Sequence, residues 1–132
     1  MQEMAGSFGQ LMPFAETLGI RWSRAEAGEV RCLLDWAPGL CTTGGALHGG
    51  ALMALADSAG GACAYLNLPD GAPGTTTVES KTSFLRAARS GTVEAVSRPL
   101  HAGRTLIVVE TEVRDDQGKL VAKVTQTQLV LT

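Results

Sequence analysis

The hydrophobic positions of this chain recur with two different periods along its length. Between residues 49 and 66, Leu52, Leu55, Ala59 and Cys63 recur at spacings of three and four residues. This period is typical of an α-helix, and the segment is apolar on most of its circumference. The pattern therefore predicts one long helix in the middle of the chain, which we expect to be buried.

Most of the remaining chain alternates in the manner of β-strands. The alternation predicts two strands before the helix and four after it, at residues 20–24, 29–36, 75–85, 91–100, 105–114 and 120–131. Ile107, Val109, Thr111 and Val113 are expected on one face of their strand. Residues 1–18 have a looser spacing that predicts one or two short helices.

This element order indicates an α+β domain spanning residues 1–132. The four later strands are expected to follow one another as a meander. An apolar helix among antiparallel strands must bury its surface against them, so we expect a sheet of about five or six strands wrapped around one long central helix.

Asp57 is the only charged residue of the predicted helix. The next charged residues along the chain are Asp35 on one side and Asp70 on the other. A buried carboxylate without a partner is costly. The ordinary alternative is an acid that points to solvent or pairs with an arginine. The apolar surroundings favour a functional role for Asp57.

Composition limits the classes of function that need to be considered. Hydrophobic residues make up 45% of the chain and charged residues only 18%, which suggests that a partner, most simply a second copy, covers apolar surface. A net charge of −2 argues against nucleic-acid binding. Three cysteines and two histidines have no metal-like spacing, so no metal site is predicted.

The N-terminal residues lack the features of a signal peptide, and no apolar run is long enough to span a membrane. Together with the three unpaired-looking thiols, this predicts a cytoplasmic protein that does not engage a membrane.

Basic residues gather in one part of the sequence. Residues 81–105 hold five bases against the single acid Glu94, a net charge of +4; the bases are Lys81, Arg86, Arg89, Arg98 and Arg104. Such a zone on an acidic protein suggests a local anionic ligand. Scattered arginines in contact with solvent are an equally good interpretation at this point.

Gly49 and Gly50 open the predicted helix. The first N–H groups of a helix have no internal partner and carry partial positive charge, so they suit an oxyanion. Asp57 lies eight residues beyond Gly49, which is about 12 Å along a helix axis. A single helix cannot present both ends to one carbonyl group, whereas two antiparallel copies can. If this is an active site, the spacing predicts that it forms between two subunits.

Taken together, these residues resemble the hotdog-fold acyl-CoA thioesterases, specifically the branch that includes the phenylacetate-degradation thioesterase PaaI. The resemblance rests on the motif His48-Gly49-Gly50, with the acid Asp57 nine residues after the histidine at the end of Leu55-Ala56-Asp57. The segments TTVESKTSFLRAA (76–88) and AGRTL (102–106) resemble later strand motifs of the family.

The resemblance implies roles for individual residues. The Gly49 N–H would polarise the thioester carbonyl, and Asp57 of the facing subunit would attack it or activate water. His48 would hold the loop and the thioester, and Thr77 would help to place the water. Relatives commonly carry Asn six residues before the histidine; here Thr42 occupies that position, and Thr42 or Thr43 is the candidate polar substitute.

The resemblance also implies the ligand and the assembly. The substrate would be an aromatic or medium-chain acyl-CoA, and no separate cofactor is expected because CoA is part of the substrate. The expected assembly is a homodimer that pairs into a homotetramer. Candidate substrate contacts are Gly50, Arg86, Arg89, Arg104 and Thr105. The alternatives are a hotdog-fold acyl-thioester dehydratase or hydratase, and a non-catalytic acyl-CoA-binding sensor.

Overall fold

The structure is a computed structural model that describes residues 8–9 and 11–132. The elements whose full extent lies within the described residues are the helices α2 and α3, two short 3₁₀ turns and six strands. Their bounds are α2 Pro13–Leu18, β1 Arg21–Glu26, β2 Glu29–Asp35, η1 Pro38–Leu40, η2 Thr43–Gly45, α3 Gly49–Leu66, β3 Thr75–Phe84, β4 Thr92–Ala102, β5 Leu106–Arg114 and β6 Leu120–Val130.

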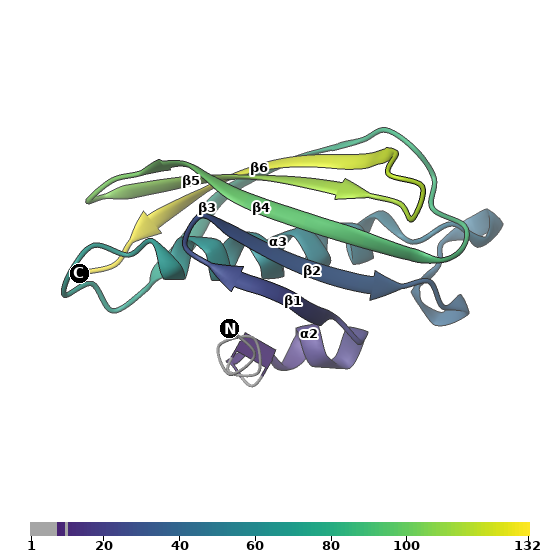
Figure 1. Cartoon of the computed structure of the whole chain (residues 1–132), viewed down its shortest axis with the longest axis horizontal. Coiled ribbons are helices and arrows are strands. Elements are labelled where there is room, and N and C mark those ends of the chain that lie inside the picture. Colours follow the sequence, from purple (N-terminus) through teal and green to yellow (C-terminus); the bar gives the residue numbers. More distant parts are fainter. Residues whose placement is uncertain (1–7, 10) are drawn as a thin grey trace.

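The six strands form one antiparallel sheet in the order β1-β2-β4-β5-β6-β3 (Figure 1). The prediction of a four-strand meander is therefore wrong, because β3 does not pair with β4. The segment with α3 carries the chain to the far edge of the sheet, where β3 pairs with β6 from Thr75↔Val130 to Phe84↔Ala122. The position beside β4 is taken by β2 instead.

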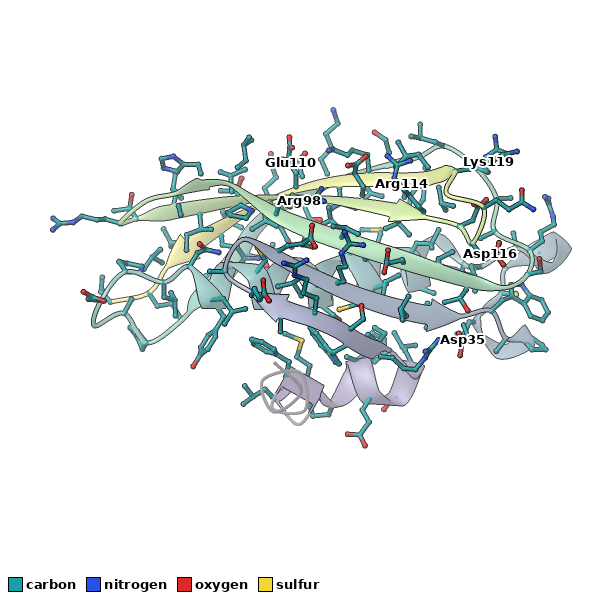
Figure 2. All side chains as sticks on the ribbon, viewed as in Figure 1. Asp35, Arg98, Glu110, Arg114, Asp116 and Lys119 are labelled. Atoms are coloured by element: carbon teal, nitrogen blue, oxygen red, sulfur yellow. The ribbon has the colours of Figure 1, made fainter. Side chains whose placement is uncertain are left out.

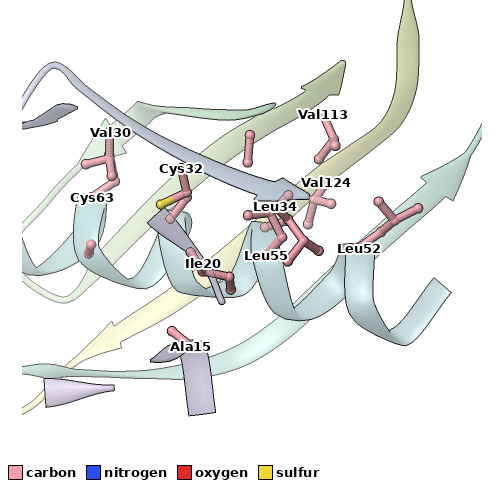
Figure 3. Close-up of a cluster of buried hydrophobic side chains, with 14 of the residues drawn as sticks. Ala15, Ile20, Val30, Cys32, Leu34, Leu52, Leu55, Cys63, Val113 and Val124 are labelled. Atoms are coloured by element: carbon pink, nitrogen blue, oxygen red, sulfur yellow. The ribbon is translucent and has the colours of Figure 1, made fainter. Parts of the chain in front are cut away.

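One side of α3 packs on the inner face of the sheet. Small side chains, including Ala56, Ala59 and Ala62, are fully buried there and let the helix approach the strands closely. Leu55 is also fully buried, and Leu34, Val113 and Val124 surround the same region (Figure 3). The predicted helix bounds of residues 49–66 are confirmed, as is the inward face of β5 from Ile107 to Val113.

The other side of α3 is not covered by the sheet. Gly50, Met53, Asp57 and Tyr65 are exposed along it, and β3 is exposed over most of its length. We call this uncovered helix side the open face. The expectation that the sheet buries every side of the helix is thus wrong for the single chain, and Asp57 is exposed rather than buried.

Charged side chains occupy the outer face of the sheet, turned away from α3 (Figure 2). Glu29 accepts hydrogen bonds from Arg31 and Arg98, each at 2.7 Å. The bond from Arg31 is the main reason why the pKa of Glu29 lies below its ordinary value. This face is stabilised by alternating charges in contact with solvent.

α2 lies beneath β1 (Figure 1). Its residues Phe14 and Leu18 line a cavity with His48 and Gly50 at the start of α3, whereas Phe8 lies against the C-terminal half of that helix. The Phe8 ring stacks on Trp22 at 5.4 Å between centroids and meets Tyr65 edge-on at 6.0 Å. α2 is the later part of the helical region expected over residues 1–18; residues 1–7 and 10 lie outside the described residues. None of the helices in the described part of the chain has the length and apolar character needed to cross a membrane.

Candidate active site

The start of α3 is organised by His48. Its imidazole Nδ1 accepts a hydrogen bond from the Gly50 N–H at 2.7 Å, and its carbonyl oxygen accepts from the Ala51 N–H at 2.9 Å. His48 is therefore the N-cap of the helix. The Gly49 N–H has no hydrogen-bond partner among the described residues, so it is the donor at this end left for a ligand.

Both glycines at the helix start have close neighbours that a larger side chain would displace. A Cβ atom on Gly50 would lie 2.9 Å from His48 Nδ1 and would disturb the cap. A Cβ atom on Gly49 would lie 3.0 Å from the Phe84 ring, which covers this end of the helix from β3. Neither glycine has a positive φ, so space rather than backbone flexibility explains the pair.

Asp57 is held from the sheet by a glutamine. Gln126 on β6 donates a hydrogen bond from Nε2 to Asp57 Oδ1 at 3.0 Å. The described residues place no cation within ion-pair distance of Asp57. One carboxylate oxygen of Asp57 thus accepts a hydrogen bond from a neutral donor, and the group forms no salt bridge with the described residues.

A cavity of about 450 Å³ opens beside Asp57. Thr77 and Gln128 line the same cavity, and Gln128 Nε2 donates to the Thr77 hydroxyl at 2.6 Å. The rest of its wall combines apolar residues with Gly74, Thr75 and Thr76; the other lining residues are Phe8, Leu11, Met12, Gly61, Tyr65 and Pro73. The cavity therefore combines apolar residues with a carboxylate and a hydroxyl.

A single chain does not bring all the predicted catalytic residues together. Asp57 and Thr77 share one cavity, whereas Gly49 lines a second one with Phe84 and Arg86. His48 and Gly50 line a third. Thr42 is exposed in the loop before the helix, where its N–H donates to the Ala46 carbonyl, and it lines none of these three cavities.

The basic zone of the sequence is divided by the fold. Arg86 and Arg89 lie in the β3–β4 connection at the end of the molecule where α3 begins, whereas Arg104 and Thr105 lie in the β4–β5 turn at the opposite end (Figure 1). Arg98 is paired with Glu29 on the outer face. Within a single chain, the predicted contacts to CoA are thus divided between two ends of the molecule.

Sequence reasoning missed the two glutamines of β6. Gln126 is fully buried and Gln128 is 2% exposed, in a strand whose other inward residues include Val124 and Val130. Two glutamines at inward positions of a strand are a usable signal, because a buried amide must find partners. In the described residues, no group of three or more His, Cys, Asp or Glu side chains is arranged to hold a metal ion.

The fold and this site define a class of protein. One long helix lies against a six-stranded antiparallel sheet, which is the hotdog architecture, and the helix carries a free N–H at its start and a carboxylate further along. The family model of the thioesterase superfamily matches residues 44–122. The chain belongs to the thioesterase superfamily, and the prediction of a thioester hydrolase is confirmed at the level of the family.

Individual relatives agree with this membership. The protein MT1895 of Mycobacterium tuberculosis is 31% identical over 114 residues, which cover 85% of this chain and 81% of that protein. The 1,4-dihydroxy-2-naphthoyl-CoA hydrolase of Escherichia coli is 38% identical over 76 residues, 58% of this chain and 55% of that protein, so this match spans about half of the relative.

Among solved structures, a thioesterase from Haemophilus influenzae superposes with a TM-score of 0.89 at 26% identity, over 97% of this chain and 90% of the other. The predicted hotdog fold is thereby confirmed.

Proposed function

We propose that this protein hydrolyses the thioester bond of an acyl-CoA at a site shared by two copies of the chain. Asp57 of one copy acts as general base or nucleophile, and the Gly49 N–H of the other copy binds the carbonyl oxygen. One observation carries the proposal. The helix presents an unpartnered Gly49 N–H and an Asp57 carboxylate held by Gln126, and the two groups lie too far apart on one helix to reach the same carbonyl.

The separation decides how the site is assembled. Eight residues of helix place Asp57 about 12 Å beyond Gly49, whereas a reacting carbonyl must be about 3 Å from both groups. Two α3 helices that meet antiparallel along their open faces would place each Gly49 beside the other Asp57. Met53, midway between the two positions and 40% exposed, would then lie near the symmetry axis.

The surface around the open face supports such a dimer. β3 forms the edge of the sheet and pairs only with β6 within the described chain, so its outer backbone groups are free to pair with another strand. Val78, Phe84 and Leu85 on and beside this strand are between 52% and 58% exposed. Apolar side chains beside an open strand edge indicate a surface that a partner covers.

The chemistry follows from the two groups. With Asp57 as general base, its carboxylate takes a proton from water while the water oxygen bonds to the thioester carbon. The carbonyl electron pair moves to oxygen, where the Gly49 N–H stabilises it. When that pair returns, the carbon–sulfur bond breaks and CoA leaves as a thiolate that takes up the proton. The products are a carboxylic acid and free CoA.

The nucleophilic variant uses the same atoms in a different order. An Asp57 oxygen bonds to the thioester carbon and expels the CoA thiolate, which forms a mixed anhydride. Water then cleaves the anhydride and regenerates the carboxylate. The Thr77 hydroxyl, in the same cavity as Asp57, is suited to orient the water in either variant.

The residues around Asp57 and around Gly49 suit different parts of the substrate. The cavity beside Asp57, with Phe8, Tyr65 and Met12 in its wall, suits an aromatic or medium-chain acyl group. Arg86 and Arg89 lie at the Gly49 end of α3, where they suit the phosphates of CoA. In an antiparallel dimer the β4–β5 turn of the partner, with Arg104 and Thr105, comes toward that end. Basic residues of the two chains would then form one binding site for CoA.

The membership of the PaaI-like branch, the pairing of dimers into a tetramer and the location in the cytoplasm belong to this proposal as well. His48 serves it by fixing the helix start, and Thr42 by keeping a polar group in the preceding loop.

Release of free thiol from benzoyl-, phenylacetyl- and hexanoyl-CoA tests the proposal. We expect hydrolysis by the native protein and a loss of about 10³-fold or more in kcat for Asp57→Ala, with acyl-CoA binding retained. Because Asp57 is exposed in the single chain, this variant should fold normally. Equal hydrolysis by both proteins would overturn the role of Asp57. Binding without hydrolysis would favour a non-catalytic acyl-CoA-binding sensor. Hydration of an enoyl-CoA would favour an acyl-thioester hydratase.

Mixing two inactive variants tests the shared site. Asp57→Ala removes the carboxylate, and Gly49→Val blocks the N–H and presses on Phe84. A heterodimer of the two variants contains one intact site and one doubly defective site. Unfolding and refolding an equal mixture should restore about a quarter of the native activity, because half of the dimers are then mixed. No recovery, with both variants folded and mixed dimers formed, would overturn the site shared between two chains.

A further inference from the structure

We propose that Gln126 is the positioning residue for Asp57, and that Gly60 is glycine because the amide of Gln126 occupies the space where its side chain would be. This inference rests on the proposed function of Asp57. It extends that function to two residues that belong to neither the helix start nor the cavity wall.

The contact between Gln126 and Asp57 has a fixed direction. A carboxylate only accepts hydrogen bonds, so the amide nitrogen of Gln126 must face Asp57 Oδ1, as the 3.0 Å distance shows. Gln126 is fully buried and lies outside the residues that line the cavity. It therefore cannot touch a substrate, and any effect on turnover must pass through Asp57.

The other end of the amide reveals the cost of this arrangement. Gln126 Oε1 is buried and has no hydrogen-bond partner among the described residues. Leaving a buried acceptor unpaired destabilises a fold. An apolar residue at this inward position of β6 would avoid that cost, so the retained amide points to a purpose at its nitrogen end.

Gly60 provides the space through which the amide reaches the helix. A Cβ atom at this position would lie 1.6 Å from Gln126 Oε1 and 2.8 Å from Gln126 Cδ, so the amide could not remain. Gly60 lies three residues after Asp57 and thus on the neighbouring turn of α3. Gln126 crosses the helix at Gly60 and meets Asp57 at the edge of the open face.

The contact restricts a side chain that otherwise has freedom. Asp57 is exposed, and it has no ion pair in the described part of the chain to hold its carboxylate in one rotamer. A hydrogen bond to Oδ1 leaves Oδ2 for the reaction and orients it. Misplacing a reacting group by about 1 Å can cost about 10²-fold in rate.

Gln126→Met tests the inference, because it keeps the volume of the side chain and removes the donor. We expect kcat for the acyl-CoA used above to fall about 10- to 100-fold with KM changed less than threefold. Gly60→Ala should produce the same kcat loss, since it displaces the amide while leaving both Gln126 and Asp57 in the chain. Full kcat in both folded variants would overturn the inference.

Ser97→Ala is the matched control for a purely structural effect. Ser97 is fully buried on β4, and its hydroxyl contacts the Thr111 hydroxyl at 2.6 Å without any contact to Asp57. This variant should lower the melting temperature and leave kcat unchanged. If it lowers kcat as much as Gln126→Met does, loss of packing explains both variants and the inference is wrong.

The side-chain NH₂ signals of Gln126 in a ¹⁵N-labelled protein give a readout that needs no turnover. In the native protein we expect one downfield, slowly exchanging proton, which moves upfield and exchanges faster in Asp57→Ala. An unchanged signal would show that the contact is absent and overturn the inference. Asp57→Ala with full activity would instead overturn the proposed function, whatever the Gln126 signals show.

Discussion

The two sides of α3 differ in what their side chains do. The side against the sheet consists of small and aliphatic residues such as Leu55, Ala59 and Cys63, all fully buried. The open face carries Gly50, Met53, Asp57 and Tyr65, all exposed in the single chain. The first side supplies the stability of one chain, and under the proposed function the second supplies the catalytic carboxylate and a surface for a second chain.

This difference separates two kinds of consequence. A change on the covered side acts on the free energy of unfolding, whereas a change on the open face acts on assembly and turnover. Gln126 and Gly60 are the exception, because they lie on the covered side and act on the open face through Asp57.

Among changes outside the catalytic groups, the largest effect is expected from Met53→Arg on the open face. Two like charges near the symmetry axis would repel each other, so the dimer should dissociate and kcat per chain should fall by about 10²-fold or more. Sedimentation and thiol release at the same protein concentration measure both changes. Leu129→Arg is the matched control: Leu129 is 41% exposed on the outer face of β6, against 40% for Met53. A fully active monomer of Met53→Arg would contradict the shared site.

Leu55→Ala on the covered side should act on stability instead. It leaves a cavity in the core, so the free energy of unfolding should fall by about 2 to 5 kcal/mol. Urea unfolding measures this change. For the fraction that remains folded, kcat should stay within about twofold of the native value. A selective loss of kcat in a stable Leu55→Ala protein would remove the distinction between the two sides.

Gly61→Ala offers a smaller effect of opposite sign. The nearest atom to a Cβ at Gly61 is Met12 Cε at 3.9 Å, so alanine fits and favours the helix by about 0.5 to 1 kcal/mol. The neighbouring Gly60→Ala should not show this gain. Thermal unfolding of the two variants compares adjacent glycines on the two sides of one helix, and equal melting temperatures would contradict the steric account.

Glu29→Gln, on the outer face of the sheet, should change stability least. The pKa of Glu29 is lowered in the folded chain, so its ionised form stabilises the fold above its ordinary pKa of about 4.3. That contribution is lost as the pH falls through the lowered value. Urea unfolding should show a difference of up to about 1 kcal/mol from the native protein at pH 7 and none near pH 2. A difference that grows at acid pH would contradict the sign.

The sequence predicted local structure better than it predicted pairing. The bounds of α3 were readable because capping and turn residues mark both ends, His48-Gly49-Gly50 at the start and Asn67 onward at the end. The position of β3 in the sheet was not readable from the sequence, because strand order depends on contacts between residues far apart in the chain. Within the single chain, the same limit applies to the basic zone, which the topology divides between two ends.

The candidate site was predictable where its residues share one helix. Asp57 stands out as the only charge on α3, and His48 and Gly49 mark its start. Gln126 was missed because it lies 69 residues from Asp57 and its contact depends on the register of β6 against the helix. The roles of Thr77 and Thr42 stay predictions.

If the proposed shared site is right, the distance between Gly49 and Asp57 makes the turnover rate depend on protein concentration. If each site takes one group from either chain, a solution diluted below the dissociation constant of the dimer loses its sites along with its dimers. Specific activity should then fall in proportion to the remaining dimer, and substrate that bridges the two chains should hold them together. Expression level, and not only sequence, would thus set how active each copy of this protein is.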